Sequence, residues 1–217
     1  MEKLLLTFYL ASAIEHNPKL KKKEAEEWKN IIKQEFNHLS LGIYDPVDRE
    51  AQKTGKNSTE TGDYIRGLKQ AGHWNLFHKE LDKIWWGNIN AENHRIEILL
   101  SLRNRFLIDG NSITDLNYWG DEEAVIRSDF IIAYMEKNVK TVGTIREIHD
   151  CYLFKIPVYL ILPDQTKTEA NSTLIDMVIK SGGDIFYSIN DCIKFIKEKY
   201  NIKIIENTKE TKTEKDK

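Results

Sequence analysis

Residues 128–162 read SDFIIAYMEKNVKTVGTIREIHDCYLFKIPVYLIL, and this stretch decides the fold. It contains two apolar runs rich in β-formers, which predict strands over Phe130–Met135 and Val158–Leu162. Between these runs, Thr144–Phe154 is predicted to be a helix. A helix that connects two parallel strands makes a right-handed crossover between them. The stretch therefore predicts a βαβ unit in a parallel sheet.

The same alternation extends through the rest of the chain. Further strands are expected over Leu4–Ala11, Leu39–Tyr44 and Asp184–Tyr187, which gives a sheet of five strands. The other expected helices are Lys19–Phe36, Leu76–Leu107 in at least two pieces, Ser112–Arg127, Ser172–Lys180 and Ile189–Tyr200. The polar segment Thr54–Gly62 reads TGKNSTETG and is expected to be a surface loop.

This pattern predicts an α/β fold with a flavodoxin-like, doubly wound, mostly parallel five-stranded sheet. Helices are expected on both faces of the sheet, together with a helical insertion. We expect one domain over residues 1–205, with the helical elaboration at about 55–120. Residues 206–217, ENTKETKTEKDK, contain no apolar side chain and are predicted to be a disordered charged tail.

The composition excludes several classes of function. The chain has 217 residues, and its 32 basic and 34 acidic side chains leave a formal charge of −2, which does not favour binding to a nucleic-acid polymer. Cys151 and Cys192 have no paired spacing, and the six histidines show no metal-binding motif, so we expect no metal and no cofactor. The apolar run near the N-terminus is too short to span a membrane. A cytoplasmic protein without a membrane partner is expected.

Ligands of open parallel sheets bind beyond the carboxyl ends of the strands. One candidate segment there is Gly143-Thr144, followed three residues later by Glu147. Thr144 and Glu147 fit a capping box, in which both side chains would serve only to begin a helix. Alternatively, Gly143 would let a ligand approach the backbone closely, and Glu147 would face that ligand.

Several features occur together in a characteristic order. A strand preceded by Asp129 is followed by the Gly143-Thr144 pair, by Glu147 on a helix, and by a strand entered through Pro157. Two further segments, FYLASAI (8–14) and YDPVDRE (44–50), precede them, and an acidic residue lies eight positions before Asp129. In this order and spacing, the sequence resembles the nucleoside 2-deoxyribosyltransferase family and the wider superfamily of nucleoside and nucleotide N-glycosidases. The resemblance covers the first 50 residues and about 120–195.

The resemblance implies an enzyme that cleaves or transfers the N-glycosidic bond of a (deoxy)nucleoside or nucleoside monophosphate through a glutamate-linked glycosyl intermediate. Glu147 would be the nucleophile, and Tyr9 would orient it. Asp129 or Asp121 would be the acid or would hold the sugar hydroxyls. The expected substrate-binding residues are Asp121, Gly143, Thr144, Ser12, Asp45 and Asp48. Two carboxylates with separate tasks are the usual requirement of a retaining glycosidase. The resemblance also implies a homo-oligomer, for which the tryptophan-rich segment from Trp74 to Trp119 offers an apolar surface.

Other interpretations remain open at this point. The chain would be a non-catalytic nucleotide-binding module if Glu147 serves only as a helix cap, or a phosphate-recognising Rossmann-like enzyme of another type. Asp129 would then be a turn residue between a helix and a strand, and Tyr9 a core tyrosine. The sequence also departs from the family at Lys140–Val142, where an acidic residue is usual, and at His149, where a small residue is usual. Transferase and hydrolase, ribose and 2-deoxyribose, and the identity of the base are not distinguished.

Overall fold

The computed structural model describes residues 6–12, 22–36, 41–48, 58–87, 120–137, 142–165 and 169–202. Its strands are β1 (Leu6–Ser12), β2 (Leu41–Tyr44), β3 (Phe130–Tyr134), β4 (Val158–Ile161) and β5 (Asp184–Phe186). They form one five-stranded sheet in the order β2-β1-β3-β4-β5, and every neighbouring pair is parallel. This is the strand order of the flavodoxin-like doubly wound fold. The predicted fold class is therefore confirmed.

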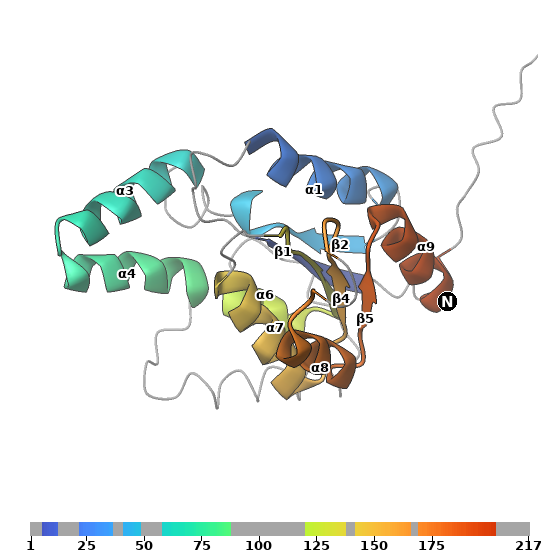
Figure 1. Ribbon diagram of the computed structural model, residues 1–217. Coiled ribbons are helices and arrows are strands. Elements are labelled where there is room, and N and C mark those ends of the chain that lie inside the picture. Colours follow the sequence, from blue (N-terminus) through green and yellow to red (C-terminus); the bar gives the residue numbers. More distant parts are fainter. Residues whose placement is uncertain are drawn as a thin grey trace, which may run out of the picture.

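Helices cover both faces of the sheet (Figure 1). On one face lie α1 (Lys22–Phe36) and α9 (Ile189–Lys199), and on the other lie α6 (Asp121–Arg127), α7 (Val142–Phe154) and α8 (Ser172–Lys180). The central strand β1 is buried from both sides, because Phe8 and Leu10 pack against α1 whereas Tyr9 and Ala11 face the α6–α8 side. This double burial explains why the run is apolar at successive positions.

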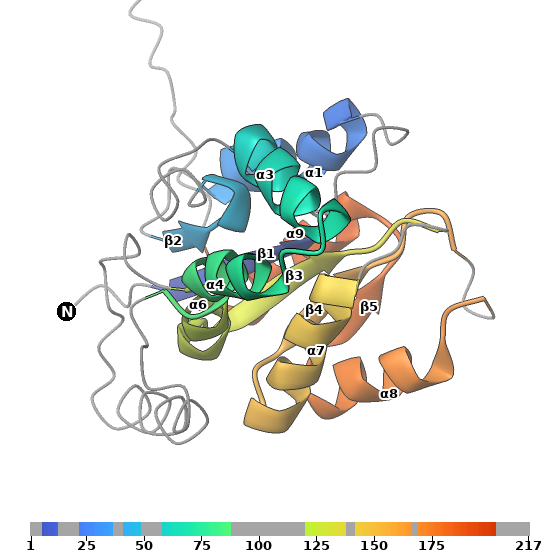
Figure 2. The same cartoon turned by 90° about the vertical axis from the view of Figure 1, so that its left-hand side faces the viewer.

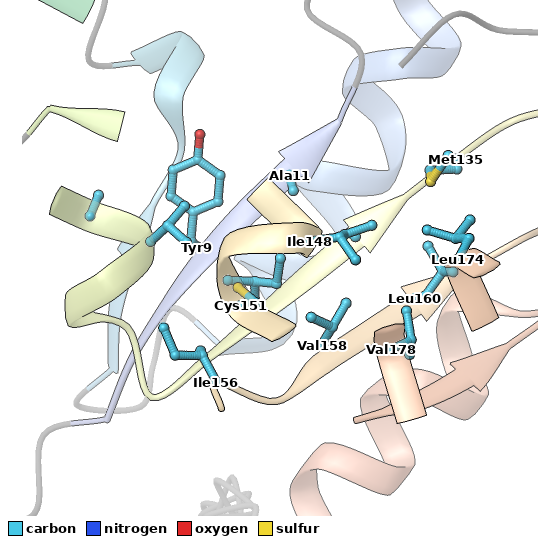
Figure 3. Close-up of a cluster of buried hydrophobic side chains, with 14 of the residues drawn as sticks. Tyr9, Ala11, Met135, Ile148, Cys151, Ile156, Val158, Leu160, Leu174 and Val178 are labelled. Atoms are coloured by element: carbon cyan, nitrogen blue, oxygen red, sulfur yellow. The ribbon is translucent and has the colours of Figure 1, made fainter. Parts of the chain in front are cut away.

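The apolar core beneath α7 and α8 contains Ile148, Cys151, Leu160 and Val178, which meet between the helices and the sheet (Figure 3). Tyr9 belongs to the same cluster, but its hydroxyl group points away from these side chains (Figure 3). A buried tyrosine hydroxyl needs a hydrogen-bond partner. The hydrogen-bond partner of Tyr9 is therefore expected at the margin of this core.

Two helices, α3 (Ser58–Gln70) and α4 (Trp74–Trp85), form a pair that extends from one side of the sheet (Figures 1 and 2). They fall within the elaboration predicted at about 55–120. The expected surface loop over Thr54–Gly62 is wrong where the structure describes it, because residues 58–62 begin α3. Serine, threonine and asparagine favour loops and helix N-termini alike, so their composition alone could not separate the two.

The helix expected over Ser112–Arg127 is also corrected. α6 begins only at Asp121, because Gly120 is extended, with φ −72° and ψ 165°. A Cβ atom at Gly120 would lie 2.5 Å from the carbonyl oxygen of Trp85 and 2.6 Å from the amide nitrogen of Gly87. Gly120 thus allows the end of α4 to pack directly against the start of α6. Residues 88–119 lie outside the described residues.

The remaining boundaries agree closely with prediction. Helix α8 has the predicted limits, and β3, β4, β5 and α9 each end one residue earlier than expected. Helix α7 begins at Val142, two residues before the predicted start. The predicted starts at Leu4, Lys19 and Leu39 and the tail from residue 206 lie outside the described residues. In the parts of the chain that the structure describes, no helix combines the length and apolarity needed to cross a membrane.

Gly183 is expected to be essential for the packing of β4 against β5. A Cβ atom there would lie 1.8 Å from the carbonyl oxygen of Val158. Because backbone cannot move away cheaply, Gly183→Ala should lower the free energy of unfolding by about 3 kcal/mol. The matched control is Gly67→Ala inside α3, where a Cβ atom meets nothing within 4 Å, so the stability should rise by up to about 1 kcal/mol. Urea unfolding measures both, and equal midpoints for the two variants would contradict the expectation.

Candidate functional site

The hydroxyl group of Tyr9 donates a hydrogen bond of 2.6 Å to Oε1 of Glu147. Tyr9 lies on β1, and Glu147 lies in the second turn of α7, which follows β3. The Tyr9 ring is fixed by stacking on Tyr44, the last residue of β2, with ring centroids 5.4 Å apart and an angle of 14°. Two adjacent parallel strands thus orient the side chain that holds Glu147.

The second carboxylate oxygen of Glu147 is unpaired in the part of the chain that the structure describes. Oε2 is buried and makes no hydrogen bond within the described residues, and the same is true of Oγ1 of Thr144, one turn earlier on α7. Buried polar atoms in proteins are nearly always hydrogen-bonded, so an unpaired one calls for an explanation. The Glu147 carboxylate therefore has one oxygen fixed by Tyr9 and one available to another group.

Asp121 is the second carboxyl group of the site. It is the first residue of α6 and is buried, and its Oδ1 accepts a hydrogen bond of 3.2 Å from the hydroxyl of Tyr44. The two stacked tyrosines therefore contact one carboxylate each, Glu147 for Tyr9 and Asp121 for Tyr44. This arrangement brings three predicted site residues, Tyr9, Glu147 and Asp121, into one cluster.

Burial raises the pKa of Glu147 to about 8. The hydrogen bond from Tyr9 and the charge of Lys29 oppose this rise, whereas Asp121 and Asp150 add to it. Burial also raises the pKa of Tyr9 well above its usual value, with Asp121 and Glu147 acting in the same direction. The N-terminus of α7 would favour a charged carboxylate, but burial outweighs it. Glu147 is accordingly protonated at neutral pH and loses its proton at mildly alkaline pH.

A further group of charged side chains, which the sequence did not indicate, lies between α6 and α7. Glu122 is buried and forms an ion pair with Arg146. Burial raises the pKa of Glu122 to about 9, and the neighbouring Asp150 acts in the same direction. The guanidinium of Arg146 lies 3.6 Å from the centre of the Trp85 ring. Three consecutive acidic residues at the start of a helix usually face solvent, where they complement the helix dipole. No signal in the sequence distinguished their burial here.

The structure does not bring Asp129 to the cluster of Tyr9, Glu147 and Asp121, and its catalytic role stays a prediction. Oδ2 of Asp129 accepts a hydrogen bond of 2.6 Å from the backbone amide of Thr7, and its own amide donates to the Thr7 carbonyl. Asp129 precedes β3, so it lies at the amino end of the strands, away from the end where α7 begins. Its carboxylate joins the entry of β3 to β1, which is the structural alternative considered for this residue.

Asp45 and Asp48, which follow β2, are engaged in ion pairs with α1. Asp45 is buried and lies 2.7 Å from both Lys29 and Lys33, and Lys33 also pairs with Asp48 at 2.7 Å. Burial alone would raise the pKa of Asp45, but the two lysines together lower it below its usual value. These pairs anchor α1 to the carboxyl end of β2, and their proposed contact with substrate stays a prediction.

The capping box predicted for Thr144 and Glu147 is wrong. Because α7 begins at Val142, Thr144 lies inside the first turn rather than before it, and the Glu147 side chain bonds to Tyr9 instead of the helix backbone.

The other predicted positions lie outside the cluster of carboxylates. Gly143 is exposed, and nothing lies within 4 Å of where its Cβ would be. Ser12 ends β1 and pairs in register with Tyr134. His149 is exposed, with Asp150 at 3.7 Å, so its bulk does not enter the cluster.

The described residues contain no group of three or more histidine, cysteine, aspartate or glutamate side chains arranged to hold a metal ion. Tyrosine hydroxyls contact Glu147 and Asp121, and Arg146 pairs with Glu122. The arrangement presents the Glu147 carboxyl group, with one oxygen unpaired within the described residues, and the carboxyl group of Asp121.

Comparison with known proteins gives fold-level similarities. No protein-family model and no curated protein matches the chain. A solved 2-deoxyribosyltransferase from the psychrotolerant bacterium Bacillus psychrosaccharolyticus is similar, with a TM-score of 0.44 and 14% identity over 85% of this chain and 88% of that one. A conserved protein from Enterococcus faecalis has a TM-score of 0.48 and 14% identity over 90% and 99%. At this identity, neither similarity bears on the activity of this chain.

Proposed function

We propose that the chain cleaves or transfers the N-glycosidic bond of a (deoxy)nucleoside or nucleoside monophosphate, with Glu147 as the nucleophile. The observation that carries this proposal is the state of the Glu147 carboxylate, which Tyr9 holds by Oε1 while the buried Oε2 makes no hydrogen bond to any described residue. A nucleophilic carboxylate needs this combination of fixed orientation and one free oxygen. The motifs around Gly143 and Glu147 support the same chemistry through the family they resemble.

In the proposed first step, Oε2 attacks the anomeric carbon of the sugar on the face opposite the base. A carbon–oxygen ester bond forms as the carbon–nitrogen bond breaks, and the base departs with the bonding electron pair. In the second step, water or a second base attacks the same carbon and releases the glutamate. Hydrolysis and transfer share the first step and differ only in the acceptor.

We assign to Asp121 the role of the acid, or of a ligand to the sugar hydroxyls, because it contacts Tyr44 in the cluster whereas Asp129 lies at the other end of the strands. Departure of the base requires a proton, which a neighbouring acid supplies. The nucleophilic form of Glu147 is the charged one, so the first step should accelerate as the pH rises toward about 8, where Glu147 loses its proton.

The raised pKa of Glu147 is also the observation that favours the alternative, a nucleotide-binding module without catalysis. A protonated carboxyl group at neutral pH is a hydrogen-bond donor and would suit recognition of a ligand as well as attack on it. Incubation with a panel of nucleosides and nucleotides, with and without a free base, distinguishes the two. Release of base indicates an enzyme, exchange of base indicates a transferase, and binding without turnover over pH 6–9 would replace the proposed function by the alternative.

We also propose that copies of the chain associate through the α3–α4 pair. Trp74 and Leu76 on α4 are large apolar side chains with exposed fractions of 54% and 48%. Tyr64 on α3 is exposed to 39%. Apolar surface that is exposed together in this way commonly marks a contact between proteins.

Tyr9→Phe is expected to lower the rate of base release about 10- to 100-fold. The variant keeps the ring that stacks on Tyr44 but loses the hydroxyl that fixes Oε1 of Glu147, and loss of one oriented hydrogen bond costs about 1.5–3 kcal/mol when a charged group is involved. The pH of half-maximal rate should also rise, because this hydrogen bond lowers the pKa of Glu147.

Tyr159→Phe is the matched control. It removes a buried hydroxyl that pairs with the Tyr200 hydroxyl at 2.9 Å on the other face of the sheet. This variant should lose a comparable amount of stability while it keeps its activity. Equal loss of activity in both variants would mean that Tyr9 acts through stability alone.

A further inference from the structure

Tyr44 connects the Tyr9–Glu147 pair to the second carboxyl group of the cluster. It is the last residue of β2 and pairs in parallel register with Tyr9 of β1, so both side chains point to the same face of the sheet. Their rings stack with centroids 5.4 Å apart. The Tyr44 hydroxyl donates a hydrogen bond of 3.2 Å to Oδ1 of Asp121. Because Tyr9 bonds to Glu147 in turn, an unbroken series of contacts runs from one carboxyl group to the other.

The backbone that carries Tyr44 is anchored by α1. The next residue, Asp45, is buried and lies 2.7 Å from both Lys29 and Lys33 of that helix. Tyr44 itself is only 1% exposed. A buried ring that has a fixed backbone and a stacked neighbour has little room to rotate. The position of the Tyr44 hydroxyl is therefore set by the surrounding elements and does not depend on Asp121.

Asp121 lies at the same end of the sheet as Glu147. Helix α6 begins at Asp121 and runs to the entry of β3, so its first residue lies toward the carboxyl ends of the strands. Glu147 lies in the second turn of α7, which follows the carboxyl end of β3. The Asp121 residue is 8% exposed. The hydrogen bond from Tyr44 fixes one oxygen of this largely buried carboxyl group.

We infer that Tyr44 is a positioning residue for Asp121: its hydroxyl holds the Asp121 carboxyl group in the orientation in which that group meets the substrate. The inference rests on the proposed function, because it gives Tyr44 a part in base release that is exerted through Asp121. The alternative is a core tyrosine whose hydroxyl only stabilises the fold. The two differ in whether the effect of the hydroxyl on activity requires the Asp121 carboxyl group.

A double-mutant cycle on kcat/KM for base release tests this difference. Tyr44→Phe keeps the stacked ring and loses the hydroxyl, so kcat/KM should fall about tenfold. Asp121→Asn should lower it by about 100-fold or more. When Asp121→Asn is already present, Tyr44→Phe should cost no more than about twofold, because the group it positions is gone. The same loss in both backgrounds, or no loss in either, would overturn the inference.

Tyr159→Phe is the matched control, since it removes a buried hydroxyl that pairs with Tyr200 at 2.9 Å on the other face of the sheet. It should keep its activity in both backgrounds. Asp121→Glu is a second variant, which keeps the carboxyl group but moves it by one methylene group relative to Tyr44. Misplacement of this size should lower kcat/KM at least tenfold. Near-normal activity of Asp121→Glu would contradict the inference, whether or not Tyr44→Phe folds.

Urea unfolding of the same variants tests the contact without substrate. If Tyr44 and Asp121 are coupled, their effects on the unfolding midpoint should not add, and the double variant should unfold at the midpoint of the less stable single variant. If the wild type releases no base from any nucleoside or nucleotide, the proposed function fails. The midpoints then decide the inference, and additive shifts would overturn it.

Discussion

Replacement of Glu147 by glutamine should lower the rate of N-glycosidic bond cleavage about a thousandfold or more, as for other deletions of a nucleophile. Glutamine keeps the shape of the side chain and can still accept the Tyr9 hydrogen bond, but it lacks the charged oxygen that attacks. The fold should be unaffected at neutral pH, because the buried carboxyl group is then protonated and glutamine is also neutral. Base release measured over pH 6–9 provides the comparison.

Glu123→Gln is the control for this experiment. Glu123 is a buried glutamate on α6 that pairs with Arg127 at 2.7 Å. The proposed mechanism gives it no role. Its activity should stay within a few-fold of the wild type. A 2-fluoro-2-deoxy nucleoside should in addition trap the glycosyl ester on the peptide that contains Glu147. Normal turnover by Glu147→Gln, or an adduct elsewhere, would remove Glu147 from the mechanism.

The free energy of unfolding should fall steeply as the pH rises from about 5 to 9. Glu147 and Glu122 have pKa values of about 8 and 9 in the folded protein, against 4.5 as their ordinary value. The folded state therefore binds more protons than the unfolded state in this window, and stability decreases with pH. Burial raises the pKa of Glu123 too, which acts in the same direction.

The sign is opposite for Asp45. Its pKa is lowered from 3.8, because Lys29 and Lys33 outweigh the effect of burial, so its stabilisation is present above pH 3.8 and is lost on acidification. Stability should therefore be highest near pH 4–5, between the two effects. Urea unfolding at several pH values measures the profile. Glu147→Gln should flatten it and be more stable than the wild type at pH 9, and parallel profiles for the two proteins would contradict the burial of a protonated Glu147.

The fold could be predicted because burial on both faces leaves a direct mark on the sequence. The runs around Phe8 and Ile131 are apolar at successive positions, and helices of regular length separate them. The start of α3 could not be predicted in this way, since Ser58 and its polar neighbours suit a loop as well as a first helical turn. Gly120, too, gives no sign in the sequence that α4 will pack against it.

The candidate site could be predicted only in part. Tyr9, Asp121 and Glu147 were found through motif order, and the structure brings them together. Asp129 shares the motif but lies at the amino end of the strands, a difference that depends on which end of a strand a residue adjoins. Arg146 and Glu122 were missed because their pairing depends on how α6 and α7 pack, and no local pattern specifies it.

The α3–α4 pair is attached to the sheet domain at one end, through the contact of α4 with Gly120, and projects at the other. The attached end of α4 lies next to Gly120, which precedes Asp121, and its Trp85 ring contacts Arg146. The other end of the pair is the exposed turn between α3 and α4 (Figure 1), where Gly72 has a φ of +71° and nothing lies within 4 Å of a Cβ position. An exposed turn of this kind tolerates insertions. The turn at Gly72 is thus a natural attachment point for a fluorophore or an affinity tag. A methyl group added at Gly120, in contrast, would disturb the neighbouring carboxylates.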